Sequence, residues 1–263
     1  MKYSILINQF KRRNFIDKAV ASAKQAMDIA TKHSIECELV TITDFDYQGG
    51  QDKGVRTDID CIGYNWAQGL KVCSGDYIFL LDDDDLFLQN KILWWDGFLN
   101  SPNRVIVPLP SLLIDSVHAP PSRLDNIIKY HLDWYSSYMG FSKEYAELLI
   151  KKGLENVQHS VDKFNFFHAL NEGTIQSSVQ RLSIHTVNVD SKMHHIGPWF
   201  YSYTAKMFER LHPQTQNSIA ALYRDYNIKL NRFLAENTKE QYQQLTPYLP
   251  LVRKLYYRTM VKK

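Results

Sequence analysis

Gly75-Asp76-Tyr77-Ile78-Phe79-Leu80-Leu81-Asp82-Asp83-Asp84-Asp85-Leu86 is the stretch that decides the fold. It contains a short, β-forming apolar run, preceded by Ser74-Gly75 and followed directly by four carboxylates. This pattern predicts a strand buried on both faces. In an open α/β sheet, ligands bind at the carboxyl ends of the strands, where the acidic cluster would lie. Adjacent carboxylates repel one another, and Mg²⁺ or Mn²⁺ would relieve that repulsion. The alternative is a solvated acidic turn that binds nothing.

The chain before this strand alternates between strand and helix patterns. Residues 3–8 and 39–42 predict strands, and apolar residues recur at helical spacing from Ile16 to Ala30. The glycine-rich residues 49–54 predict a loop, and residues 63–72 predict a helix that leads into the central strand. Strand, helix, strand, helix, strand is typical of parallel sheets with crossover helices. We therefore expect an α/β fold with a mostly parallel central sheet flanked by helices.

Composition indicates a folded cytoplasmic protein with an unevenly distributed charge. Hydrophobic residues make up 44% of the 263 positions, and no run approaches the roughly 18 apolar residues of a membrane span. The three cysteines show no metal-like spacing, which favours reduced thiols. Residues 201–263 read as helical and hold 11 Lys and Arg against 4 Asp and Glu. Such a basic extension favours an anionic membrane surface or DNA as a partner, although solvation of exposed helices explains the charge equally well.

The order of motifs around the central strand carries a family resemblance. Asn65 lies in the predicted helix, Gly75 opens the strand, and Asp82 and Asp84 form a D-x-D motif at its end. With this spacing, the N-terminal ~110 residues resemble the GT-A glycosyltransferases of the family 2 type. The resemblance implies a Rossmann-like GT-A domain over residues 1–200, with a nucleotide-sugar-binding half (1–110) and an acceptor half (111–200). A basic helical C-terminal extension (201–263) would follow.

The resemblance also implies roles for particular residues. It assigns Asp82 and Asp84 to a divalent metal, Mn²⁺ or Mg²⁺, with His195 as a further ligand or, alternatively, a structural histidine. Residues implied to bind the nucleotide sugar are Asn8, Asp44, Asp46, Asn65 and Asp82. Asp162 is the implied general base, although an Asp at a helix start also serves as an N-cap. The chain departs from the family in lacking Pro-Thr after the first strand and D-D-G-S after the second.

The function expected from this resemblance is metal-dependent transfer of a sugar from a nucleotide diphosphate sugar, UDP-linked by default, to an acceptor hydroxyl. One base and a metal-stabilised leaving group imply inversion at the anomeric carbon. The acceptor would be a glycan, a lipid-linked glycan or a hydroxylated base in DNA. A non-catalytic nucleotide-sugar or anionic-partner binding module is the main alternative. A sugar nucleotidyltransferase is disfavoured, because residues 8–16 contain no glycine for the phosphate-binding loop that such enzymes need.

Overall fold

The fold is described here from a computed structural model. It describes residues 1–11, 15–101, 111–115, 139–172, 174–178, 182–184, 197–216, 218–236 and 238–244. The chain divides into two compact units. The first contains the described residues up to Ile184, and the second contains those from Gly197 onward.

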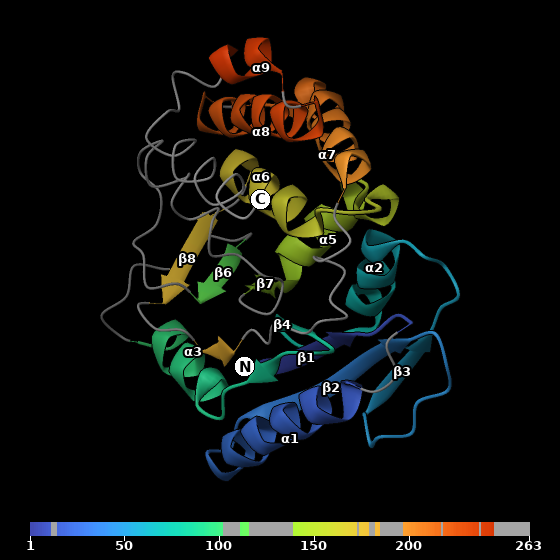
Figure 1. The fold of residues 1–263 in the computed structure, drawn as a ribbon. Helices are drawn as coiled ribbons and strands as arrows, with labels where there is room; N and C mark the ends of the chain where they lie inside the picture. Colours follow the sequence, from blue (N-terminus) through green and yellow to red (C-terminus); the bar gives the residue numbers. More distant parts are fainter. Residues whose placement is uncertain are drawn as a thin grey trace. The chain divides into compact units, whose positions relative to one another are not determined.

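A seven-stranded mixed sheet forms the centre of the first unit, in the order β3-β2-β1-β4-β7-β6-β8 (Figure 1). The strands β1, β2, β3 and β4 are parallel, and β7 runs antiparallel to both β4 and β6. β5 pairs with β9 in a separate two-stranded sheet. The strands are β1 (Lys2–Asn8), β2 (Glu36–Thr43), β3 (Lys53–Arg56), β4 (Tyr77–Asp82), β5 (Leu86–Phe87), β6 (Ser111–Asp115), β7 (Met139–Ser142), β8 (Thr174–Ser178) and β9 (Ser183–Ile184).

Helices cover both faces of the parallel half of the sheet (Figure 1). The small residues of α1, chiefly alanines, pack on one face against Ile5, Ile7 and Phe79. On the opposite face, Gly69 of α2 lies against Leu6 and Ile42. The helices of this unit are α1 (Ile16–Lys32), α2 (Ile62–Val72), α3 (Lys91–Leu99), α5 (Lys143–Lys151), η2 (Leu154–Asn156) and α6 (Val161–Glu172).

The second unit is helical in its described part. It contains α7 (Pro198–Arg210), η4 (His212–Gln214), α8 (Ser218–Glu236) and α9 (Lys239–Gln244). Phe208 of α7 packs edge-on against Tyr223 of α8, with ring centroids 5.7 Å apart. In the residues that the structure describes, no helix is both long and apolar enough to cross a membrane. The basic segment after residue 244 lies outside the described residues, and the predicted domain boundary at residue 200 stays a prediction.

The strand β3 was missed by the sequence analysis, which expected a loop through Gly54. In the structure Gly54 pairs with Thr41 of β2, and this short strand forms an edge of the sheet. A four-residue strand with a glycine and no apolar alternation leaves too little local pattern to identify. The strand is therefore defined by its hydrogen-bonded pairing with β2, and not by a pattern in its own sequence.

A buried carboxylate fixes the amino-terminal side of the sheet. Glu38 of β2 accepts hydrogen bonds from Ser4 Oγ (2.6 Å) and Ser74 Oγ (2.7 Å), and it pairs with Lys53 Nζ at 2.9 Å. Its side chain is 6% exposed. Burial acts to raise the pKa of Glu38, but these hydrogen bonds outweigh it and lower the pKa to about 2. The charged form of Glu38 therefore ties β1, β2 and the start of β4 together.

We predict that Glu38→Gln lowers the free energy of unfolding by about 2–3 kcal/mol at pH 7, measured by urea denaturation. The folded pKa lies below the unfolded value, so the stabilisation is fully present above about pH 4.5 and is lost as the pH falls towards 2. The difference between wild type and variant should shrink in the same window. Glu36→Gln is the matched control, because Glu36 is 70% exposed and its ion pair should contribute less than about 1 kcal/mol. Equal losses in both variants would contradict the prediction.

Candidate functional site

The strand register brings Asn8 and Asp82 side by side. Asn8 ends β1 and is the register partner of Asp82, which ends the parallel strand β4. Ile7 and Leu81 belong to the core that packs on α1. Because side chains alternate along a strand, Asn8 and Asp82 face the other side of the sheet, where α2 lies. Two of the predicted site residues thus meet at the carboxyl edge of the sheet.

The acidic run forms a tight turn after β4. The backbone N–H of Asp85 donates to the carbonyl oxygen of Asp82 at 3.1 Å. Asp82 and Asp84 are half-buried, whereas Asp83 and Asp85 are fully buried. This alternation leaves one carboxylate pair accessible to a ligand, and it is the pair that the D-x-D spacing predicts. Asp83 and Asp85 are directed into the protein instead.

Asn65 and Asp44 lie near the same edge. Thr57 Oγ1 donates to Asn65 Oδ1 (3.0 Å), and the N–H of Thr57 donates to the carbonyl oxygen of Thr43 (2.9 Å). These two bonds hold Asn65 of α2 against the end of β2. Asp44 follows β2 directly and accepts a 3.3 Å hydrogen bond from the N–H of Lys11, in the segment after β1. Asn65 is therefore held by Thr57, which directly follows β3, and Asp44 by Lys11, in the segment that follows β1.

Asp46 is not brought to this group. It forms an ion pair with Arg56 at 3.0 Å, and both side chains are largely exposed. Arg56 is the register partner of Thr43, on the face of the sheet opposite to Ile42 and α2. Of the two carboxylates predicted to recognise the base, only Asp44 lies beside the segment that follows β1. The sequence could not separate them, because their difference arises from a turn after β2.

The oxygen atoms at the edge suit a hard divalent cation. Asn8 Oδ1 is buried and has no hydrogen-bond partner among the described residues. The carboxylates of Asp82 and Asp84 are oxygen donors of the type that Mg²⁺ and Mn²⁺ prefer, and Asn8 lies beside Asp82. No group of three His, Cys, Asp or Glu that could hold a metal occurs in the part of the chain that the structure describes. His195, the further ligand that the resemblance implies, lies outside the described residues.

Asp162 lies in the first turn of α6, as the sequence predicts. α6 packs against β6 and β8. Ser160, two residues earlier, has a φ of 60°, a left-handed conformation that is costly for a non-glycine residue. Burial raises the pKa of the Asp162 carboxyl, and the neighbouring Lys163 partly opposes this shift. A carboxylate with a raised pKa is a stronger proton acceptor than a solvated one.

A close backbone approach connects α2 to the segment before α6. The N–H of Gly63 donates to the carbonyl oxygen of Val157 at 2.9 Å. A Cβ atom at Gly63 would lie 2.1 Å from the carbonyl oxygen of Leu154, so only glycine fits. The helix that carries Asn65 and the segment that leads to Asp162 are thereby held in direct contact.

A buried ion pair beside the acidic turn was missed by the sequence analysis. Lys91 Nζ lies 2.6 Å from Asp115 Oδ2 and 2.8 Å from Ser183 Oγ, and Trp95 Nε1 donates to Asp115 Oδ1 at 2.9 Å. The side chains of the pair are 0% and 1% exposed. Burial lowers the pKa of Lys91 and raises that of Asp115, and the attraction between their charges opposes both shifts. Asp85 contributes a further negative charge acting on Lys91.

Two signals for this pair were present in the sequence. A lysine in the first turn of a helix opposes the helix macrodipole, so it needs another source of stabilisation. Asp115 follows an apolar run, as Asp82 does. Since β6 and β4 both run antiparallel to β7, Asp115 lies at the same edge of the sheet as Asp82. Only the tertiary structure shows that Asp115 pairs with Lys91.

Comparison with solved structures identifies the fold. The first 349 residues of S. aureus TarS, crystallised with UDP-GlcNAc, align with a TM-score of 0.61 and 14% identity over 93% of this chain and 78% of that chain. The mannosyltransferase PcManGT from Pyrobaculum calidifontis, in complex with GDP-Man and Mn²⁺, aligns with a TM-score of 0.59 and 10% identity over 98% and 79%. The chain has the GT-A fold.

Sequence comparisons do not assign this chain to a protein family. No protein-family model matches the chain, and no curated protein matches it. With UDP bound, the TarS segment aligns at 17% identity over 89% of this chain and 72% of its own. At such identities the likeness establishes the GT-A fold alone. The predicted α/β class and mostly parallel sheet are confirmed, and the residue roles within the GT-A fold stay predictions.

We predict that Lys91→Met lowers the free energy of unfolding by about 3–5 kcal/mol, because it leaves Asp115 buried without a counter-charge. Urea denaturation measures the loss. The double variant Lys91→Met/Asp115→Asn should recover most of it, since no uncompensated charge then remains. Lys71→Met is the control, because Lys71 and Glu155 form an exposed pair that should contribute less than about 1 kcal/mol. A double variant as unstable as the single one would contradict this explanation.

Proposed function

We propose that this protein is a glycosyltransferase that moves a sugar from a nucleotide diphosphate sugar to an acceptor hydroxyl. The proposal rests chiefly on one observation: Asn8 and Asp82 meet at the carboxyl edge of a GT-A sheet, beside the accessible Asp84. TarS was crystallised with UDP-GlcNAc and PcManGT with GDP-Man and Mn²⁺. Their common ligand class is a nucleotide diphosphate sugar, and a UDP-sugar is the default donor here.

The donor would bind along the edge. Asn65 and Asp44 would contact the nucleoside, with Asp44 accepting a hydrogen bond from the base and Asp82 contacting the ribose or a metal-bound water. Asp82 and Asp84 would hold Mn²⁺ or Mg²⁺, which, when bound, neutralises the charge that develops on the departing phosphate. Asn8 Oδ1, buried without a partner among the described residues, is available to a donor hydroxyl or a bound water.

Asp162 would accept the proton of the acceptor hydroxyl as that oxygen attacks the anomeric carbon. Direct attack opposite the leaving phosphate inverts the configuration at that carbon. The raised pKa of Asp162 suits this role, because a base with a higher pKa takes the proton more readily. The acceptor remains a glycan, a lipid-linked glycan or a hydroxylated nucleobase, with a membrane surface or DNA as the possible contact of the basic extension.

We predict that Asp84→Asn weakens Mn²⁺-dependent binding of the preferred nucleotide at least tenfold, because it removes one anionic ligand of the cation. Calorimetric titration with UDP and GDP, with and without Mn²⁺, measures the effect and identifies the base. Asp28→Asn, a change of the same type on the exposed side of α1, should bind as wild type does. Unchanged metal-dependent binding in Asp84→Asn would exclude this residue as a ligand.

We predict that Asp162→Asn lowers the slow hydrolysis of the bound donor about 10²–10⁴-fold while leaving donor affinity unchanged, because only proton transfer is lost. In wild type, hydrolysis should fall as the pH falls through the raised pKa of Asp162, since the protonated acid accepts no proton. That acid limb should lie above the ordinary pKa of Asp and should vanish in Asp162→Asn. Glu147→Gln, on the exposed face of α5, is the control.

These measurements also separate catalysis from binding alone. If donor binds but neither hydrolysis nor transfer occurs in wild type, the protein is a binding module and Asp162 is a structural residue. If no nucleotide binds with either metal, the proposed function fails entirely.

A further inference from the structure

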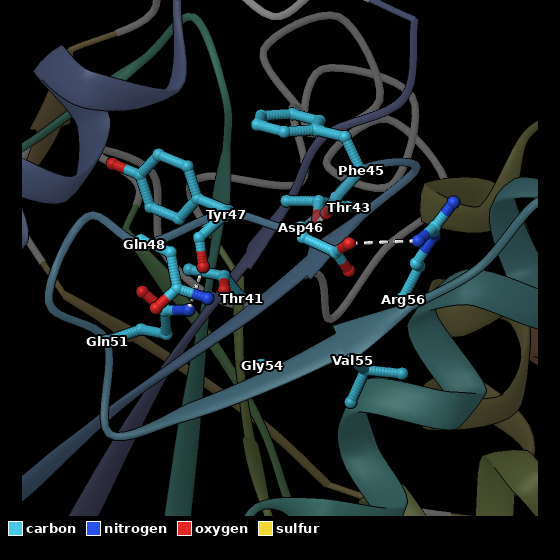
Figure 2. Close-up of a pocket in the computed structure, with 10 residues that line it drawn as sticks. All are labelled: Thr41, Thr43, Phe45, Asp46, Tyr47, Gln48, Gln51, Gly54, Val55 and Arg56. Atoms are coloured by element: carbon cyan, nitrogen blue, oxygen red, sulfur yellow. Dashed lines mark hydrogen bonds and ion pairs between the residues drawn. The ribbon is translucent and has the colours of Figure 1, made fainter.

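A small pocket lies between the β2–β3 edge of the sheet and residues 45–51 (Figure 2). Its volume is about 240 Å³. The floor is formed by β2 and β3, and the side chains of Phe45 and Tyr47 stand over it in the view of Figure 2. The ion pair of Asp46 with Arg56 lies to one side.

The pocket exists because the crossover between two parallel strands contains no helix. Such connections commonly span a dozen or more residues and include a helix that covers the sheet. Here residues 44–52 return directly to the start of β3. Gly54 contributes no side chain to this space, and a Cβ there would lie 3.1 Å from Gln51 Nε2. β2 contributes the polar residues Thr41 and Thr43 to this gap, and Val55 of β3 lines it as well.

Two polar atoms in the pocket are buried without hydrogen-bond partners among the described residues. Thr41 is 1% exposed, and neither its Oγ1 nor the Oε1 of Gln51 is hydrogen-bonded. Thr43 Oγ1 donates to the carbonyl oxygen of Phe45, which leaves the hydroxyl able to accept. Buried polar groups are almost always paired, so two unpaired groups lining one cavity point to a ligand that supplies the missing bonds.

The residues that line the pocket indicate which class of ligand it would bind. It offers hydroxyl and amide groups beside aromatic rings, a combination that suits a sugar ring with polar hydroxyls and an apolar C–H face. The rings of Phe45 and Tyr47 are inclined at 84°, so they form a corner and cannot sandwich a flat base. Arg56 is the only cation among the lining residues, and Asp46 already neutralises it, which disfavours an anion.

We propose that this pocket binds an uncharged sugar ring of monosaccharide size, apart from the donor. Thr41 and Thr43 lie on the face of β2 opposite to Ile42, which packs on α2. Asn8 and Asp82 face the α2 side. The pocket and the proposed donor site thus lie on opposite faces of the sheet, and a sugar held in the pocket is not the one attached to the nucleotide.

Saturation-transfer NMR with free glucose, galactose, mannose and N-acetylglucosamine tests the proposal in the full chain. At least one sugar should bind, and saturating UDP with Mn²⁺ should not displace it. Thr41→Val should weaken binding about fivefold or more without lowering Tm, because it removes a buried hydroxyl that has no partner while keeping the shape. Gly54→Val should abolish binding by filling the pocket. Thr31→Val, the same change on the exposed side of α1, is the matched control and should bind as wild type does.

Other outcomes overturn the inference. If none of the sugars binds, or if Thr41→Val binds them as wild type does, the pocket is not a sugar site. If UDP with Mn²⁺ displaces the sugar, binding occurs in the donor site, and the proposed function stands while this inference fails. Sugar binding that is unchanged in Asp84→Asn, whose nucleotide binding is weakened, supports the pocket independently of the proposed function.

Discussion

The parallel pairing of β1 with β4 is the constraint on which the rest of the site depends. It places Asn8 beside Asp82, because each residue ends its strand at the same level. The strands are mainly apolar on both faces and covered by helices, and the polar residues Asn8 and Asp82 lie where the strands end. The acidic run therefore lies at the sheet edge, and the turn after Asp82 exposes alternate carboxylates.

Two buried charged groups hold β4 at its opposite ends. Glu38 accepts a hydrogen bond from Ser74, just before the strand begins. Lys91, shortly after the acidic turn, pairs with Asp115 and donates a hydrogen bond to Ser183. Each charge is balanced by specific partners, so each is stable only when the surrounding strands are in place. The acidic turn, whose like charges repel, is thus anchored by residues outside the proposed site.

The two faces of the parallel half-sheet carry different surfaces near its edge. On the side of α2, glycine residues allow close packing: Gly69 lies against β1 and β2, and Gly63 touches the backbone that leads to Asp162. On the side of α1, the short connection after β2 leaves threonines under a loop instead of a helix. The proposed donor site and the separate polar pocket therefore lie on opposite sides of this half-sheet.

The sequence by itself determined the α/β class and the positions of Asp82, Asp84 and Asp162 at element ends, because these follow from local apolar patterns and from motif spacing. The tertiary structure decided that Gly54 lies in a strand, that Asp46 pairs with Arg56, and that Lys91 pairs with Asp115. Those features depend on strand register and on contacts between segments distant in the sequence. A local pattern carries no information about which distant group will compensate a buried charge, so only the folded chain could reveal it.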